Sequence, residues 1–312
     1  RIIAALIGLV LMSTTVGAQD PVSAVPMAPG VLVGNADGAV AWVADAQGRV
    51  TAVGLDDGNI RWRAAEGLPL AVHEQRLVVL ARPQEPGKLS LLLLNPNDGS
   101  ALGGVLGDLP DGVLATPEPQ PNRIFNAEAV TSNGALAIRW TYAQWPLRGA
   151  KLVSNDPNDG RWERSGAVSV DLAGSRLQAI ANKSLPAPRT PDLIGAERVS
   201  NLEGTQFRAA DDAFVQVASA VADGVLGTQW RWSLHERSTG RAAGSLVLPY
   251  ANAPYLLRGN QLLWRSEPLM VLQSNGEYVG HGARLVAQSI ATGQELWSVP
   301  LLDRNYRGPL PP

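Results

Sequence analysis

The sequence predicts an all-β protein built from a repeated unit of four antiparallel strands. Short runs rich in Val, Ala, Trp and Thr, residue types that favour strands, alternate with turns that end in glycine. A pattern of strand, turn, glycine, strand and tryptophan occurs near both ends of the chain. No helical periodicity persists over a long stretch, which argues against an α/β fold.

The N-terminal copy of this pattern lies in Gly38–Arg63. Its first two strands are predicted at Ala39–Ala44 and Arg49–Leu55, and each is followed by a turn that closes on a glycine. Glycine suits these turns because tight hairpins require positive φ. After the second turn, Trp62 follows Gly58 by four residues.

The same spacing returns in Ala283–Pro300, where Trp297 follows Gly293. Similar turns lie between, at intervals comparable to the about 40 to 50 residues that a four-stranded propeller blade needs. A β-sandwich would not normally repeat one turn chemistry at such intervals. The prediction is therefore a β-propeller of six blades, with seven as the alternative. The turn glycines are Gly58, Gly99, Gly160, Gly204, Gly240 and Gly293.

The repeats are expected in the following order. The first ends at Arg63 and the second spans Leu70–Leu106. The predicted strands of the third repeat are Ala135–Thr141, Ala150–Ser154 and Arg161–Arg164, and those of the fourth are Arg176–Asn182, Arg198–Leu202 and Thr205–Ala209. The predicted strands of the fifth repeat are Ala213–Ala220, Thr228–Leu234 and Ala242–Leu248. The sixth repeat is predicted to contain Tyr255–Arg258, Gln261–Arg265 and Ala283–Pro300.

The N-terminal residues match a secretory signal. Arg1 precedes the apolar run Ile2–Met12, and small residues at Val16 and Ala18 precede an expected cut before Gln19. The apolar run is shorter than the roughly 20 residues of a membrane span. The expected organisation is a signal peptide (1–18), a lead-in (19–29), the propeller (30–301) and a tail (302–312), in a periplasmic or secreted protein without a transmembrane span after signal removal.

The composition excludes several classes of function. The chain is 45% hydrophobic and 17% charged, which is typical of globular proteins. A formal net charge of −2 gives no basic footprint for nucleic acid. The absence of cysteine excludes disulfides, thiolate nucleophiles and Cys-ligated metals.

No catalytic, cofactor-binding or metal-binding residue is assigned. His73, His235 and His281 are isolated in sequence and form no paired metal motif. The group Asn97–Gly99 lacks the ligand spacing of a calcium loop and is interpreted as a tight turn. The chain is therefore not expected to be an enzyme.

The repeated pattern resembles that of the PQQ-like (quinoprotein-like) β-propeller family. The resemblance implies that Trp62, Trp162 and Trp297 lie in outer strands and pack between adjacent blades. It also implies that a strand from one terminus, Val22–Val33 or Leu301–Tyr306, completes the last blade. The family's alcohol dehydrogenases use a vicinal cysteine pair, which this sequence lacks; the resemblance is to the non-catalytic branch.

The loops predict where a partner binds. The glycine turns are expected to join third to fourth strands on one rim, the glycine rim. Longer connections then lie on the opposite, elaborated rim: Arg82–Gly87, Pro110–Pro121, Tyr142–Gly149, Ser184–Ala196 and Ser266–Gly282. Its candidate binding residues are Trp145, Arg148, Arg189, Met270, Tyr278 and His281.

The functional hypothesis is an exported, non-catalytic interaction scaffold in the bacterial cell envelope, with another envelope protein as partner. Two alternatives remain: a quinoprotein-type propeller enzyme, or a propeller that binds a small ligand or sugar. The loops could also be passive insertions, because surface loops tolerate added residues.

Overall fold

The computed structural model describes residues 24–34, 39–117, 122–132, 134–144, 162–186, 205–208, 214–224, 227–236, 238–248, 255–266, 268–272 and 278–302. Within these ranges the chain forms strands and one short 3-10 turn, Asn182–Ser184. The strands form antiparallel sheets that follow one another along the chain. The predicted class, an all-β propeller, is confirmed.

The first sheet has five strands in the order β1-β2-β3-β4-β5. The innermost strand, β1, lies in the segment expected to be a lead-in, and β2 pairs with both β1 and β3. The described part of Val22–Val33 therefore belongs to the first sheet and does not complete the last one. The strands are β1 (Ala24–Ala28), β2 (Val31–Gly34), β3 (Val40–Ala44), β4 (Arg49–Gly54) and β5 (Ile60–Glu66).

The second and third sheets have four strands each. A single parallel pair, Arg176 with Leu106, joins their outer strands into one eight-stranded sheet. The second comprises β6 (Leu68–His73), β7 (Arg76–Ala81), β8 (Lys88–Leu94) and β9 (Ala101–Asp108). The third comprises β10 (Arg123–Ser132), β11 (Ala135–Gln144), β12 (Trp162–Asp171) and β13 (Arg176–Ile180).

The fourth and fifth sheets also have four strands each, and the fifth carries a separate hairpin between its second and third strands. The fourth comprises β14 (Thr205–Arg208), β15 (Phe214–Gly224), β16 (Gly227–Glu236) and β17 (Ala242–Leu248). The fifth comprises β18 (Tyr255–Arg258), β19 (Gln261–Ser266), β22 (Arg284–Ser289) and β23 (Glu295–Pro300). The hairpin comprises β20 (Leu269–Leu272) and β21 (Tyr278–His281).

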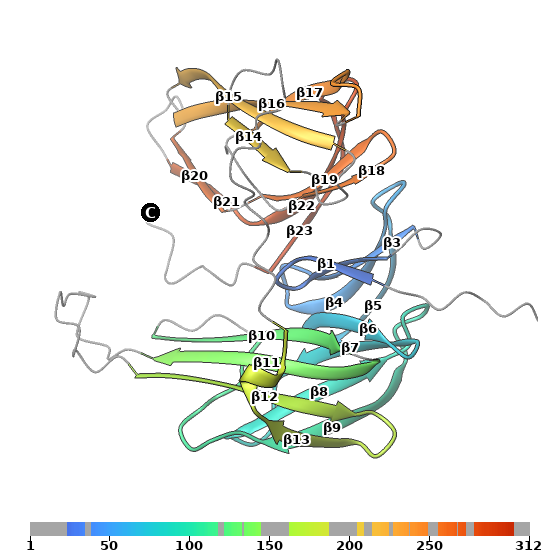
Figure 1. The fold of residues 1–312 in the computed structure, drawn as a ribbon, viewed down its shortest axis with the longest axis vertical. Helices are drawn as coiled ribbons and strands as arrows, with labels where there is room; N and C mark the ends of the chain where they lie inside the picture. Colours follow the sequence, from blue (N-terminus) through green and yellow to red (C-terminus); the bar gives the residue numbers. More distant parts are fainter. Residues whose placement is uncertain are drawn as a thin grey trace, which may run out of the picture.

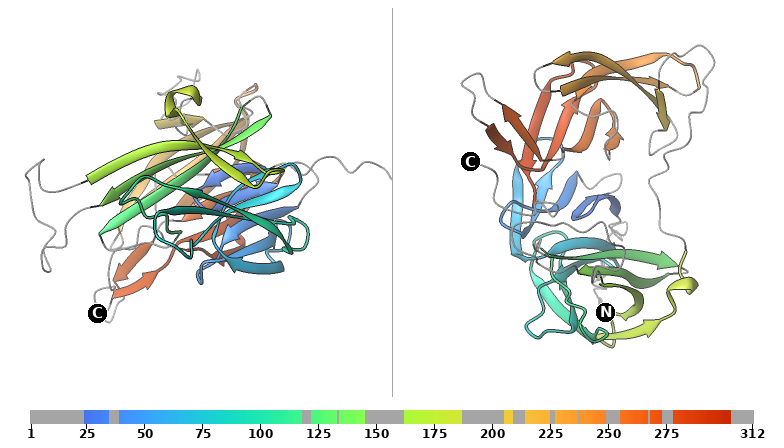
Figure 2. Two further views of the ribbon diagram at one scale, coloured as in Figure 1. Left: turned by 90° about the horizontal axis from the view of Figure 1, so that it is seen from below. Right: turned by 90° about the vertical axis from the view of Figure 1, so that its left-hand side faces the viewer.

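The first sheet lies in the middle of the molecule, between the second and the fifth (Figures 1 and 2). Apolar clusters fill the spaces between neighbours: third with second, second with first, first with fifth, and fifth with fourth. Each sheet between two neighbours thus has both faces covered, which is the packing of propeller blades.

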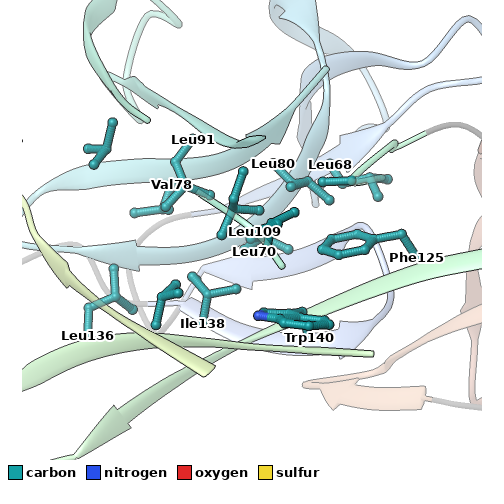
Figure 3. Packing of buried hydrophobic residues seen from close by; sticks show 14 of the residues in the cluster. Leu68, Leu70, Val78, Leu80, Leu91, Leu109, Phe125, Leu136, Ile138 and Trp140 are labelled. Carbon is teal, nitrogen blue, oxygen red and sulfur yellow. The ribbon is translucent and has the colours of Figure 1, made fainter. Parts of the chain in front are cut away.

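The largest of these clusters lies between the second and third sheets (Figure 3). Leu80 and Leu91 of the second sheet and Ile138 of the third are almost fully buried. The rings of Phe125 and Trp140 stack across β10 and β11, with centroids 6.1 Å apart. Burying one such side chain contributes about 1.5–3 kcal/mol, so this cluster is a major source of stability.

Four turns that lead into the outermost strand of a sheet share one hydrogen-bond geometry. In each, the glycine N–H donates to the carbonyl four residues earlier, at 2.7–2.9 Å. The residue before the glycine accepts the backbone N–H of the residue after it through a side-chain oxygen. All four glycines have φ between 68° and 74°: Gly58, Gly99, Gly240 and Gly293.

Two tryptophans cover the turn of the neighbouring sheet, as predicted. A Cβ placed on Gly99 would lie 2.5 Å from Cε3 of Trp62, and one on Gly58 would lie 2.6 Å from Cγ of Trp297. Trp297 Nε1 also donates to the carbonyl of Leu55 at 3.0 Å. These rings fill the gaps between the second and first sheets and between the first and fifth.

The third sheet differs from the predicted third repeat in its first and last strands, and the predicted strand Ala150–Ser154 lies outside the described residues. Strand β10 precedes Ala135, so Trp162 begins the third strand of its sheet, and its predicted place in an outer strand is wrong. Arg176–Ile180 becomes the fourth strand of the same sheet. Gly160 falls between β11 and β12, outside the described residues, and so does not join a third strand to a fourth.

The fourth predicted repeat does not form a sheet of its own among the described residues. Its first strand closes the third sheet, and its last, at Thr205–Arg208, opens the fourth. Gly204 lies outside the described residues, just before this strand. The described strands form five blade-like sheets, so the predicted count of six is not confirmed.

Candidate functional site

The described connections of the second and fifth sheets follow the predicted division between the two rims. Short turns join first to second strands on the glycine rim, such as the turn at Glu74 and Gln75, where both residues have positive φ. The connections between second and third strands lie on the opposite rim, and in the fifth sheet this connection contains the β20–β21 hairpin. The predicted Ser266–Gly282 loop is thus partly a hairpin.

The predicted binding residues fall in two groups. Trp145, Arg148 and Arg189 lie outside the described residues. Met270 lies in β20, and Tyr278 and His281 lie in β21, where the structure describes the backbone. The register places Leu269 opposite His281, Met270 opposite Gly280 and Leu272 opposite Tyr278. The hairpin therefore brings these three predicted residues to one short element of the elaborated rim.

A second group of side chains, which the sequence analysis did not predict to lie together, is found at the elaborated-rim end of the third sheet. We call it the rim cluster: Arg123, Tyr142, Gln144, Trp162 and Arg164. Arg123 of β10 lies opposite Gln144 of β11, which lies opposite Trp162 of β12. Tyr142 lies opposite Arg164 in the next row on the same face. Three strands thus bring the cluster together directly beside the predicted Trp145–Arg148 segment.

Specific contacts hold the rim cluster. The hydroxyl of Tyr142 donates to Gln144 Oε1 at 2.6 Å. The rings of Tyr142 and Trp162 meet edge to face, with centroids 5.3 Å apart. The guanidinium of Arg164 lies 4.8 Å above the centroid of the Trp162 ring, a cation–π contact. The connection before β10 also approaches, since a Cβ on Gly112 would lie 3.1 Å from Cη2 of Trp162.

The rim cluster is rich in hydrogen-bond donors and positive charge. Burial raises the pKa of Tyr142 above its ordinary value of 10.0, and the charge of Arg123 opposes this shift. Tyr142 is therefore a neutral donor at neutral pH. The Nε of Arg123 is buried and has no hydrogen-bond partner. The cluster can therefore bind a negatively charged or acceptor-rich group.

Sequence reasoning missed this site because its residues meet only through strand register. Strand β10 was not predicted, since its alternating residues Phe125, Ala127 and Ala129 give a weak apolar signal. Tyr142 and Gln144 were placed in a loop, whereas β11 continues to Gln144. The alternation from Ile138 through Trp140 to Tyr142 is the signal that extends this strand.

A second polar group, around Asp45, is structural. Asp45 is only 5% exposed. It accepts hydrogen bonds from the N–H groups of Gln47 and Arg49 and from the hydroxyl of Thr51, each at 3.0 Å. Its backbone forms an isolated bridge with Leu301, at the end of the fifth sheet. These bonds hold the β3–β4 turn against the other end of the chain.

The acidic turns of the glycine rim are saturated by local bonds. Asp98 Oδ1 accepts the N–H of Ser100 at 2.8 Å, and Asn95 Oδ1 accepts that of Asn97 at 3.0 Å. This geometry confirms the interpretation of Asn97–Gly99 as a tight turn. Among the described residues, no group of three His, Cys, Asp or Glu side chains could hold a metal ion.

Comparisons with known proteins find similar solved structures but no matching family. No family model and no curated protein sequence matches the chain. The chain is similar to the crystal structure of BamB from Moraxella catarrhalis, with 13% identity, coverage of 82% of this chain and 80% of that one, and a TM-score of 0.24. It is also similar to the Dos1 propeller (10% identity, 80% and 62% coverage, TM-score 0.24).

A third similar structure is Sqt1 from Saccharomyces cerevisiae, with 12% identity, coverage of 85% and 71%, and a TM-score of 0.21. The chain spans 62% of the Dos1 propeller. At these TM-scores the similarities carry no argument about this chain, so both its fold and its function are argued from its own residues.

Proposed function

We propose that this protein is an exported, non-catalytic propeller with PQQ-like repeats that serves as an interaction scaffold in the bacterial cell envelope. Its partner is another envelope protein, which binds the elaborated rim. The rim cluster is the observation that supports this assignment most strongly. It combines Trp, Tyr and Arg side chains, the residue types that contribute most to binding at protein interfaces.

The position of the rim cluster supports binding at this rim. Its residues project from three long paired strands, so their positions are fixed before a partner arrives. Preorganised side chains lose little entropy on binding. The Trp145–Arg148 segment follows Gln144 directly, and the β20–β21 hairpin extends from the same rim of another sheet. A partner could engage both.

Export is supported by the N-terminal pattern of Arg1, the apolar run Ile2–Met12 and the small residues before Gln19. Within the described ranges, no helical segment could serve as a membrane span. N-terminal sequencing of the protein from an envelope fraction is expected to begin at or near Gln19. Recovery from the cytoplasm with residues 1–18 intact would contradict export.

Crosslinking and affinity capture from the envelope test the scaffold role. The double variant Trp145→Ala, Tyr278→Ala should capture the partner roughly thirtyfold less well, since truncating an interface anchor typically costs at least about 2 kcal/mol. Asn97→Ala, on the glycine rim, is the matched control and should capture normally. Equal capture by the double variant and the parent would place the binding site elsewhere.

The non-catalytic assignment has its own test. Purified protein incubated with PQQ and calcium should acquire neither a bound chromophore nor dye-reducing activity. Either result would favour the quinoprotein-enzyme alternative, because a redox cofactor supplies chemistry that the assigned residues do not.

A further inference from the structure

We propose that the rim cluster binds the carboxylate side chains of an acidic segment of the partner protein. The inference rests on the proposed function in one respect, namely that the partner is a protein. It adds the chemistry of recognition, which the sequence did not predict.

The first observation is that two arginines of the rim cluster have no carboxylate partner among the residues that the structure describes. The hydrogen bond of Arg164 goes to the backbone carbonyl of Glu163, at 3.2 Å. Arg123 makes no ion pair in the described part of the chain. Several other arginines of the described chain do pair with a carboxylate, whereas Arg76, like Arg164, donates to a backbone carbonyl. The pairs include Arg61 with Asp57, Arg139 with Glu128, Arg241 with Glu236, Arg258 with Asp56 and Arg284 with Glu295.

The second observation is the enclosure of Arg123. Its Nε is buried without a hydrogen-bond partner, although the residue as a whole is only half-buried. A buried donor without a partner is unfavourable. A carboxylate on the guanidinium would offset this, because the planar fork of arginine matches a carboxylate through two parallel hydrogen bonds.

The third observation is the donor inventory of the rim cluster. The Oε1 of Gln144 already accepts the Tyr142 hydroxyl, which leaves the amide group of Gln144 as a donor. Arginine and the indole N–H of Trp162 are donors only. Tyr142, whose pKa burial raises above the ordinary 10.0, is protonated at neutral pH and adds no negative charge. A ligand that fits must therefore supply acceptors and negative charge.

The rest of the molecule favours a protein over other anions. The formal net charge of −2 and the presence of two cations at this site differ from the extended basic surface that nucleic acids or anionic membranes require. Trp162, partly buried beneath Arg164, offers apolar contact beside the positive charges. Adjacent charge and apolar area suit a peptide with acidic and apolar residues.

Selection from a library of random dodecapeptides by the full chain tests the inference. Selected peptides should be enriched in Asp and Glu, and replacing those residues by Asn and Gln should weaken binding at least about tenfold, as expected for a charge-assisted hydrogen bond. Arg123→Gln and Arg164→Gln should each weaken binding similarly, and the effect should diminish at high ionic strength.

The matched control is Arg61→Gln, on the glycine rim, which should bind the selected peptides like the parent. Circular dichroism is used to check that each variant folds. The proposal is wrong if the selected peptides show no acidic enrichment, if Arg123→Gln and Arg164→Gln bind them like the parent, or if the cluster binds phosphatidylglycerol vesicles but no peptide.

The two proposals can fail separately. If Trp145→Ala with Tyr278→Ala abolishes partner capture while Arg123→Gln and Arg164→Gln leave both capture and peptide binding unchanged, the scaffold role holds and carboxylate recognition does not. If acidic peptides bind through the arginines but no envelope partner is captured, the carboxylate site holds and the scaffold role does not.

Discussion

The indole Nε1 of Trp297 donates a 3.0 Å hydrogen bond to the carbonyl oxygen of Leu55, 242 residues earlier in the chain. The same ring lies against Gly58, so one side chain both covers the turn and donates a hydrogen bond to one of its backbone carbonyls. The equivalent carbonyl in the second sheet, that of Pro96, accepts the indole N–H of Trp42 at 3.0 Å. Tryptophan N–H groups thus join the first sheet to both of its neighbours.

Truncating this ring should destabilise the protein. Trp297→Ala is expected to lower the free energy of unfolding by at least about 2 kcal/mol, somewhat below the about 3–5 kcal/mol of a fully buried ring, since Trp297 is partly exposed. Urea unfolding measures the change. Leu296→Ala is the control: Leu296 precedes Trp297 in β23 and is 49% exposed, so its truncation should change the free energy by no more than about 0.5 kcal/mol.

The turn glycines allow a matched comparison of steric fit. Gly99 and Gly240 have similar φ values, 74° and 68°, and their turns are closed by the same hydrogen bonds. A Cβ on Gly99 would collide with Trp62, whereas one on Gly240 meets nothing within 4 Å. Gly240→Ala should lose about 1 kcal/mol, the conformational term alone. Gly99→Ala should lose about 1–3 kcal/mol more. If urea unfolding gives equal losses of unfolding free energy for the two variants, the Trp62 ring moves aside from the new methyl group at no measurable cost.

The glycine-rim carboxylates should make stability fall in acid. The N–H and side-chain amide of Asn59 hold the pKa of Asp57 below its ordinary value of 3.8, and Ser100 does the same for Asp98. A carboxylate whose pKa is lower in the folded state than in the unfolded state stabilises the fold at pH values above its unfolded-state pKa. This stabilisation is lost as the pH falls through the folded-state pKa.

The double variant Asp57→Asn, Asp98→Asn tests this linkage, because Asn keeps an acceptor oxygen but does not titrate. Its free energy of unfolding should fall less steeply than that of the parent as the pH drops below about 4. Asp111→Asn, at an exposed position between the second and third sheets, should leave the slope unchanged. Parallel curves for the double variant and the parent would contradict the linkage.

Tyr142 should titrate later than an ordinary tyrosine. Its pKa is raised by burial, so the stability it contributes is present below pH 10.0 and lost as the pH rises through its folded-state pKa. Absorbance of tyrosinate should show a late component that Tyr142→Phe removes. Arg123→Gln should delay this component further, because the charge of Arg123 favours the tyrosinate; an earlier titration in that variant would contradict their proximity.

Local chemistry made the turns of the glycine rim predictable. At Gly58, Gly99, Gly240 and Gly293 the same short pattern, a Thr or Asp followed by glycine, specifies both the positive φ and the side-chain bond that closes the turn. Such information is contained in a few neighbouring residues. The tryptophans four residues after Gly58 and Gly293 were predictable for the same reason.

The third sheet shows where local chemistry is insufficient. Gly160 carries the same short pattern, Asp159–Gly160, yet it follows a second strand, so a turn signature does not state which strands it joins. Gly166 looks like a strand breaker, but Trp140 occupies the space where its Cβ would be. The rim cluster depends on the register of three strands, and that register is set by the common core rather than by any one segment.

The middle position of the first sheet has a consequence for biosynthesis. Of the described sheets, this one leaves the ribosome first, but one of its faces packs against Leu263, Leu285 and Val299 of the described sheet that is made last. Until those residues emerge, that apolar face is exposed to water and to other chains. That face therefore stays open to premature association until the residues of the fifth sheet have been made.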